Sequence, residues 1–121
     1  MKMLVVDDSR MARRILIGML PEPLRDSAEI HQGVNGEEAV ALWHEQRPDL
    51  IFLDLTMPVM DGFDALVAIR GQDPDTPILI VSADIQAGAV AKVMASGANG
   101  FIDKSKLAAE LHDNLKRLGF L

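Results

Sequence analysis

The sequence predicts an α/β fold, a doubly wound parallel sheet of five strands with five helices on its two faces. Two observations carry this prediction. Short apolar runs that suit buried strands alternate along the 121 residues with segments of helical periodicity. No repeat, low-complexity tract or linker interrupts the alternation, so we expect a single domain over residues 1–121.

The first strand is a short apolar run at residues 3–6, which indicates a strand buried on both faces and which ends in Asp7 and Asp8. Ser9 is the expected N-cap of the first helix, whose apolar residues recur at helical spacing until Pro21 and Pro23 end it. Residues 27–32 alternate only weakly between apolar and polar, which favours a half-exposed strand at the edge of the sheet.

The second helix is predicted to begin at Asn35, which stands three residues before Glu38 as in a capping box, and to end at Arg47-Pro48. The third strand is the run Leu-Ile-Phe-Leu at residues 50–53, and Asp54 follows it directly. A tight loop then leads to the third helix, for which Asp61 is the expected N-cap.

The fourth strand, residues 78–81, leads into Ser82 and Asp84, and a small-residue helix through residues 90–94 follows. The fifth strand, residues 100–102, leads into Asp103 and Lys104, and Ser105 is the expected cap of the last helix. Five parallel strands of this kind favour the flavodoxin-like order 2-1-3-4-5, in which the first and third strands are neighbours.

Composition excludes several classes of function. Twelve basic and 18 acidic residues give a net charge of −6, which argues against direct binding to nucleic acid. No apolar run approaches the roughly 20 residues of a membrane-spanning helix. The N-terminus lacks the pattern of a signal peptide, so we expect a cytoplasmic protein without membrane insertion. Because the chain has no cysteine, it has no disulfide and no thiolate metal site.

Polar residues follow four of the five predicted strands. In the order 2-1-3-4-5 this brings Asp7, Asp8 and Asp54 to the crevice between the first and third strands, with Ser82 and Lys104 beyond them. Three carboxylates without histidine or cysteine form an oxygen-ligand site that suits Mg²⁺, or Mn²⁺ in its place. A carboxylate is also a nucleophile toward phosphorus when a metal and a fixed cation neutralise the transferring group.

On these residues the chain resembles the receiver domains of two-component response regulators, over nearly its whole length. Its acidic pair Asp7-Asp8 and the segment DLTMPVMDG, from Asp54 to Gly62, match family motifs in the right order. Ser82, Phe101 and Lys104 match the family's hydroxyl, aromatic and lysine positions. The resemblance is to single-domain, chemotaxis-type regulators, and a receiver that is part of a longer protein stays open as an alternative.

The resemblance implies a phosphorelay switch. Asp54 would accept phosphate from the phosphohistidine of a kinase or phosphotransfer protein, with Mg²⁺ held by Asp8, Asp54 and the Thr56 backbone carbonyl, and by Asp7 through water. Ser82, Phe101 and Lys104 would relay the change to a downstream protein, which binds the face made by the fourth helix, fifth strand and fifth helix. A phosphatase is a further partner, and Thr56 and Asp84 are candidates for tuning dephosphorylation.

One departure from the family pattern concerns Lys104, which Ser105 follows in place of the usual proline. A cis bond before serine costs roughly 2.5–4 kcal/mol, whereas one before proline costs about 0.5–1 kcal/mol, so both isomers stay open. We expect that the protein is not an enzyme and that it catalyses only its own phosphoryl transfer and autodephosphorylation. Two alternatives remain, an interaction module that works without phosphate and a magnesium-dependent phosphoaspartyl hydrolase.

Overall fold

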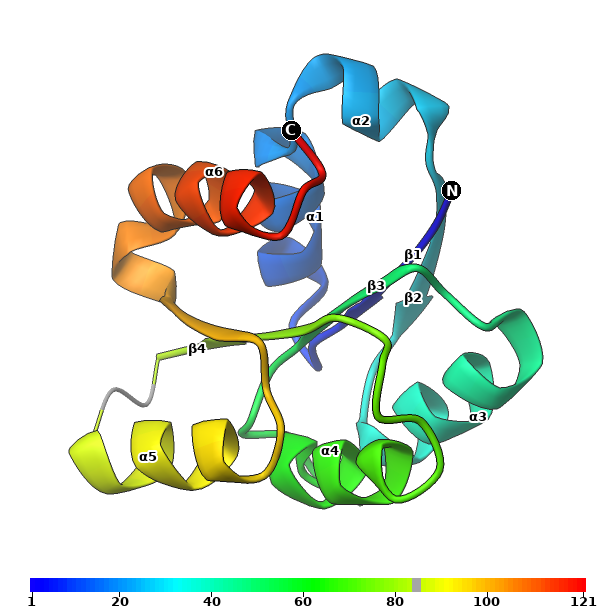
Figure 1. Cartoon of the computed structure of the whole chain (residues 1–121), viewed down its shortest axis with the longest axis vertical. Coiled ribbons are helices and arrows are strands. Elements are labelled where there is room, and N and C mark those ends of the chain that lie inside the picture. The colour runs from blue at the N-terminus through cyan, green and yellow to red at the C-terminus, as the bar shows by residue number, and fades with distance from the viewer. Residues whose placement is uncertain (84–85) are drawn as a thin grey trace.

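The computed structural model describes residues 1–83 and 86–121, and its sheet confirms the predicted topology (Figure 1). Five strands, all parallel, lie in the order β2-β1-β3-β4-β5. The strands are β1 (Lys2–Val6), β2 (Glu29–Gly33), β3 (Leu50–Leu53), β4 (Ile78–Ser82) and β5 (Gly100–Asp103). The weakly alternating strand β2 lies at an edge and is half exposed, as its pattern indicates.

Helices cover both faces of the sheet, and the described residues contain six α-helices where the sequence predicts five. Figure 1 shows α1 and α6 on one face and α3, α4 and α5 on the other. The helices are α1 (Arg10–Met19), α2 (Glu22–Ser27), α3 (Gly36–Gln46), α4 (Gly62–Arg70), α5 (Ala87–Ala95) and α6 (Leu107–Arg117).

The extra helix is α2, a short element in the segment where Pro21 and Pro23 were expected only to end a helix. Helix α1 does end before Pro21, but Pro23 then lies in the first turn of α2. Proline fits there because the first N–H groups of a helix have no partner within it. The same residue type therefore ends one helix and begins the next.

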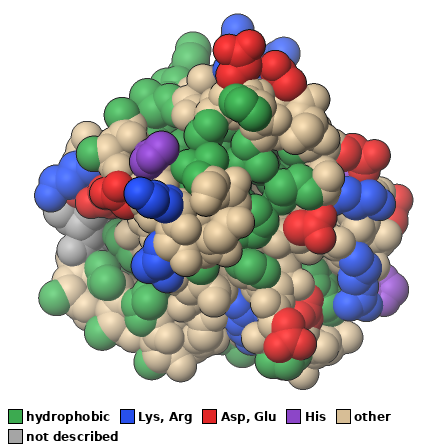
Figure 2. Space-filling model, turned by 45° about the horizontal axis from the view of Figure 1, so that its top comes forward, with side chains coloured by type: hydrophobic (Ala, Val, Ile, Leu, Met, Phe, Trp, Pro, Cys, Tyr) green, Lys and Arg blue, Asp and Glu red, His purple; other side chains and the backbone are tan. Residues whose placement is uncertain are grey.

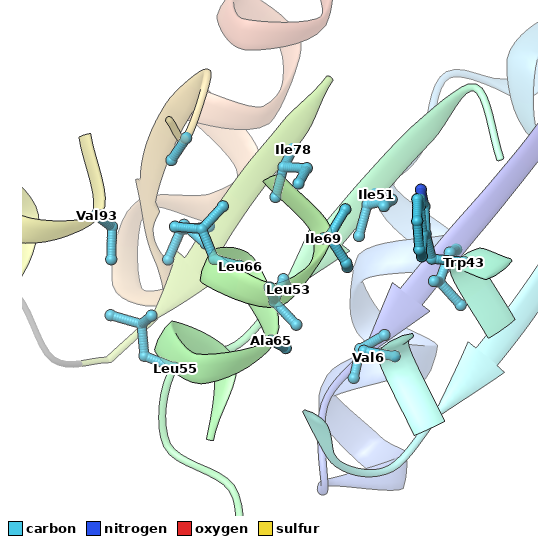
Figure 3. Close-up of a cluster of buried hydrophobic side chains, with 14 of the residues drawn as sticks. Val6, Trp43, Ile51, Leu53, Leu55, Ala65, Leu66, Ile69, Ile78 and Val93 are labelled. Atoms are coloured by element: carbon cyan, nitrogen blue, oxygen red, sulfur yellow. The ribbon is translucent and has the colours of Figure 1, made fainter. Parts of the chain in front are cut away.

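The core has two parts, one on each face of the sheet. Under α3, α4 and α5 lie Trp43, Leu53, Leu66 and Ile69, each at most 1% exposed (Figure 3). Under α1, α2 and α6 the buried side chains include Val5, Leu16, Leu20, Phe52, Leu111 and Leu115. Both faces of β1, β3 and β4 are buried, which agrees with the continuous apolar runs of these strands.

Helix capping agrees with the sequence at three helices and differs at the last. Ser9, Asn35 and Asp61 cap α1, α3 and α4, each accepting a backbone N–H bond three residues ahead. Ser105 does not cap α6. A 3₁₀ turn, η1 (Lys104–Lys106), stands before α6, and Asp103 caps it by accepting the N–H and the hydroxyl of Ser105.

A polar network lies at the amino ends of the strands, opposite the acidic edge of the sheet. Asp73 accepts hydrogen bonds from the Trp43 indole N–H and the Thr76 hydroxyl. Although burial raises its pKa, these hydrogen bonds hold the pKa of the Asp73 carboxyl well below its usual range. Arg70 donates to the Gly97 carbonyl and to the Asn99 side chain. The network ties the C-terminal end of α4 to the start of β5.

Three of the exposed large apolar side chains among the described residues form one row on α1. In that row Met11, Ile15 and Met19 are spaced by four residues and are 63%, 45% and 45% exposed. Figure 2 turns the upper end of Figure 1 toward the viewer and shows apolar side chains gathered in the middle of that face, with charged groups around them. Among the described residues, no helix has the length and apolar character needed to cross a membrane.

Candidate functional site

The acidic residues of the site are positioned by the hydrogen-bond ladder between β1 and β3. Val6 and Leu53, the last residues of these strands, lie opposite each other, and the Asp54 N–H donates to the Val6 carbonyl at 3.0 Å. One carboxylate oxygen from each of Asp7, Asp8 and Asp54 lies within 4.8 Å of the others. We call these three residues the acidic cluster. Asp7 and Asp54 are buried, whereas Asp8 is exposed.

Lys104, which directly follows strand β5, completes this group of charges at the same carboxyl edge of the sheet. Its ammonium lies 2.7 Å from a carboxylate oxygen of Asp7 and 3.2 Å from one of Asp54. The neighbouring Asp103 carboxylate instead accepts hydrogen bonds from the N–H and the hydroxyl of Ser105. No peptide bond in the described residues is cis, so the Lys104–Ser105 bond is trans, and Lys104 reaches the acidic cluster in that form.

Burial and neighbouring charges shift the pKa values of Asp54 and Lys104. Burial raises the pKa of the Asp54 carboxyl, and the nearby charge of Asp7 raises it further against the opposing effect of Lys104. For Lys104 burial lowers the pKa, but the hydrogen bond to Asp7 and the charge of Asp54 outweigh it and raise the pKa above the ordinary value. The site thus holds an ammonium and carries more negative than positive charge.

The loop of residues 55–61, which we call the acceptor loop, runs from Asp54 to α4 and is fixed near both ends. The Gly36 N–H donates to the Met60 carbonyl, and the Gly62 N–H donates to the Leu55 carbonyl. A Cβ atom at Gly62 would overlap the Asp54 carbonyl, and one at Gly36 would lie 2.5 Å from the Met60 oxygen. Both glycines are therefore required by close approach of the backbone.

Within this loop Val59 adopts a left-handed backbone conformation, with φ of +73°. The Met60 N–H donates to the Pro58 carbonyl at 3.0 Å, so Val59 is the middle residue of a three-residue turn, a strained type for a β-branched side chain. Its side chain is 77% exposed. Backbone strain of this kind persists only where the surrounding structure fixes it, as the two glycine contacts do here.

The remaining predicted site residues fall into three groups. Ser82 ends β4 and is 1% exposed, and Phe101 lies in β5 and is half-buried. Thr56 is exposed in the acceptor loop, two residues after Asp54. Asp84 lies outside the described residues.

Sequence reasoning missed Arg13. Its guanidinium donates to the Asp7 carbonyl at 2.5 Å and to the Gln32 side chain at 2.9 Å, so it joins α1 to the ends of β1 and β2. The sequence did hold a signal for this contact. Arg13 stands four residues after the N-cap Ser9, so its side chain lies over the first turn of the helix.

Comparison with known proteins decides the family. A model of the response regulator receiver domain matches residues 3–116. The chain belongs to the response regulator receiver domain family. This receiver domain is 34% identical over 117 residues to the chemotaxis protein CheY of Listeria monocytogenes, covering 97% of both chains. It is 33% identical to the response regulator protein VraR of Staphylococcus aureus, covering 96% of this chain and 55% of VraR.

Solved structures agree with this assignment. The receiver domain superposes on a chain of the CheX-CheY-BeF3-Mg complex of Borrelia burgdorferi with a TM-score of 0.87 and 28% identity, covering 99% of this chain and 89% of that one. The response regulator domain of Thermotoga maritima CheB gives a TM-score of 0.82 and 27% identity, covering 97% and 94% of the two chains. The resemblance stated from the sequence motifs is confirmed.

The donor set of the acidic cluster fits a hard divalent cation. Its three carboxylates offer only oxygen, and among the cations of the described site only Lys104 contacts their side chains. The three carboxylates and the single ammonium leave a net negative charge that a divalent cation can neutralise. Mg²⁺ suits such a site, because proteins usually bind it through one or two carboxylates while it retains several water molecules. His31, His44 and His112 do not join this cluster, and His31 instead lies 2.7 Å from Glu29.

Proposed function

We propose that this receiver domain is a phosphoacceptor switch in which Asp54 takes a phosphoryl group from the phosphohistidine of a histidine kinase or phosphotransfer protein. An Asp54 oxygen forms the new bond to phosphorus, the bond from the imidazole nitrogen to phosphorus breaks, and that nitrogen keeps the electron pair. The carrying observation is the position of Asp54, a buried carboxylate at a strand end with Lys104 at 3.2 Å and two further acids beside it.

A divalent ion belongs to this proposal. Asp8, Asp54 and the Thr56 backbone carbonyl would hold Mg²⁺ or Mn²⁺, and Asp7 would assist through water. The bound ion supplies positive charge that offsets the charge of the transferred group. Lys104 supplies the fixed cation of the site, because its raised pKa keeps it an ammonium at neutral pH.

Phosphorylation then changes the partners of two buried groups. The phosphoryl oxygens offer new acceptors to the Lys104 ammonium and to the Ser82 hydroxyl at the end of β4. Movement of Ser82 frees space for Phe101 on the neighbouring strand β5, whose residue Phe101 pairs with Ile80. The readout surface is that of α5, β5 and α6, where a downstream protein binds. A coupling free energy of about 1–3 kcal/mol is sufficient for such a switch.

The setting of this switch is the cytoplasm, with a phosphatase as a further partner and with Thr56 and Asp84 tuning dephosphorylation. We infer no enzymatic activity beyond the protein's own phosphoryl transfer and autodephosphorylation. The ion pairs of Lys104 with Asp7 and Asp54 favour this reading over an interaction module that works without phosphate, since such a module has no need for an assembled charge constellation.

Intact mass spectrometry tests the proposal. The protein is treated with acetyl phosphate in the presence and absence of Mg²⁺, and we expect a metal-dependent adduct of about 80 Da that is stable in acid and labile in base. Asp54→Asn should take up no phosphate. The control is Asp61→Asn, which changes an acid of the same loop whose carboxylate only caps α4. An adduct that persists in Asp54→Asn, or none in the wild type, contradicts the proposal.

A further inference from the structure

A cavity of about 110 Å³ lies between α1 and the face of the sheet, next to the acidic cluster, with which it shares Asp7. Its walls are mostly apolar and come from three strands, α1 and the start of α6, and include Val5, Ala12, Ile15, Phe52, Val81 and Leu107. Three charged residues, Asp7, Arg13 and Lys104, also line it. The proposed phosphoryl transfer makes no use of this space.

The cavity is held open because its walls are fixed independently of one another. Val5, Phe52 and Val81 belong to strands whose positions the sheet ladder sets. Helix α1 is tied to the sheet by Arg13, through its bonds to the Asp7 carbonyl and to Gln32. The start of α6 is fixed by the ion pairs of Lys104 and by the bond from the Asp103 N–H to Glu110. A site formed in advance binds without a cost for ordering its walls.

The lining indicates the class of ligand. Asp7 and Lys104 pair with each other at 2.7 Å, and Arg13 donates to the Asp7 carbonyl and to the Gln32 side chain. The charged groups of the lining are thus engaged within the protein, and an ionic ligand gains little from them. The apolar walls favour a neutral molecule. An apolar cavity of about 150 Å³ in another protein binds benzene. The space here is smaller, about 110 Å³, but it opens to solvent beside the exposed Ile15, so it suits nothing larger than one small ring.

We propose that this cavity binds a small neutral apolar molecule, of the size of a single aromatic ring, and that its occupancy opposes phosphorylation of Asp54. The second half rests on the proposed function, in which a phosphoryl oxygen becomes a new acceptor for Lys104; this new contact draws the ammonium away from Asp7 and Asp54. A ligand packed against Lys104 and Leu107 stabilises the position that Lys104 has in the unphosphorylated protein. By linkage, phosphorylation then weakens binding of the ligand by the same factor.

The first test is a titration with fluorobenzene, followed by ¹⁹F NMR of the ligand and by amide chemical shifts of the labelled protein. We expect saturable binding with shifts at Val5, Ala12, Val81 and Leu107. Ile15→Glu should weaken binding about tenfold or more, because it places a charge at the mouth of the cavity. The control is Met19→Glu, since Met19 has the same 45% exposure on the same row of α1 but does not line the cavity.

Ala12→Leu fills the space from within and gives a second variant that should lose binding, with Ala41→Leu, an exposed alanine of α3, as its control. Fluorobenzene should slow the labelling of Asp54 by acetyl phosphate in the wild type and in Met19→Glu, but not in Ile15→Glu. Absence of saturable binding, or equal binding by Ile15→Glu and Met19→Glu, overturns the cavity site. Binding without slower labelling overturns the coupling. If the wild type takes no phosphate at all, the proposed function fails, while the titration still decides the cavity site.

Discussion

The carboxyl group of Asp54 is less acidic than an ordinary aspartate, because burial and the charge of Asp7 both raise its pKa. The folded protein therefore binds this proton more tightly than the unfolded chain does. Stability consequently falls as the pH rises from about 4, the ordinary aspartate pKa, through the raised value in the folded state. Above that value the destabilisation is complete, so the functional carboxylate reduces stability at neutral pH.

We predict that Asp54→Asn has a higher Tm than the wild type at neutral pH without Mg²⁺. The difference should shrink as the pH is lowered toward 4, where the wild-type carboxyl regains its proton. Calorimetric melting over this range measures it, with Asp61→Asn as a control that removes an exposed acid. A difference that grows as the pH falls would contradict the raised pKa.

Val59 gives a second prediction at the scale of one residue. A left-handed conformation costs a non-glycine residue roughly 1–2 kcal/mol, and glycine gives back roughly 0.5–1 kcal/mol through the entropy of the unfolded chain. Val59→Gly should therefore stabilise the protein by up to about 1 kcal/mol in urea unfolding. Val67→Gly, in the exposed face of helix α4, should instead destabilise it by about 0.5 kcal/mol. Equal losses in both variants would show that the turn at Val59 is not strained.

At the scale of elements, the contact of α3 with the acceptor loop depends on the absence of a side chain at Gly36. We predict that Gly36→Ala destabilises the protein by about 2 kcal/mol, since its Cβ would meet backbone oxygen at 2.5 Å from Met60 and 2.7 Å from Asp61. The matched change is Gly18→Ala in α1, where a Cβ meets nothing within 4 Å. That variant should gain about 0.5–1 kcal/mol. Urea unfolding distinguishes the two, and a stable Gly36→Ala would contradict the close approach.

The central strands could be predicted from the sequence because their burial is complete. Their sequences are apolar on both faces, as in the runs at residues 3–6, 50–53 and 78–81. The alternation of such strands with helices favours the sheet order 2-1-3-4-5, and this order brings Asp7, Asp8 and Asp54 together. Helix α2 was not predictable in this way, since its six residues contain no full apolar period and proline is compatible with both ends of a helix. The turn η1 was missed because either Asp103 or Ser105 has the chemistry of a cap.

The candidate site was predictable where strand ends supply its residues, and less so where tertiary contacts do. Lys104 was predicted in the site because it follows a strand end, but its contacts with two carboxylates depend on the geometry after β5 and on the peptide bond that follows the lysine. The contact of Arg13 with the Asp7 carbonyl depends on the angle at which α1 packs on the sheet, and this angle cannot be read from the hydrophobic periodicity of the sequence. The strain at Val59 is likewise a consequence of how the loop is held, because nothing in its local sequence requires a left-handed valine.

At the scale of the whole molecule, binding of a divalent ion is expected to stabilise the fold, because the three acids of the cluster come together only in the folded chain. We predict that Mg²⁺ raises the stability by about 2.7 kcal/mol when its free concentration is 100 times its Kd. Thermal melting at constant ionic strength measures this. Asp8→Asn should lose most of the effect, whereas Asp113→Asn, which removes an exposed acid of α6, should retain it. An equal response of the two variants would indicate general charge screening.

The two ends of the sheet carry separate polar groups. The carboxyl ends hold the acidic cluster and Lys104, while the amino ends hold the network of Asp73, Trp43, Arg70 and Asn99. Between them lie the apolar strands β1, β3 and β4, which contribute no polar side chain before Ser82 except for Lys2 at the start of β1. Substitutions far apart and without shared partners have nearly additive effects on stability. Selection can therefore adjust thermal tolerance at one end and the chemistry of the acidic cluster at the other in independent steps, so that a lineage can adapt to a warmer habitat without changing the acidic site.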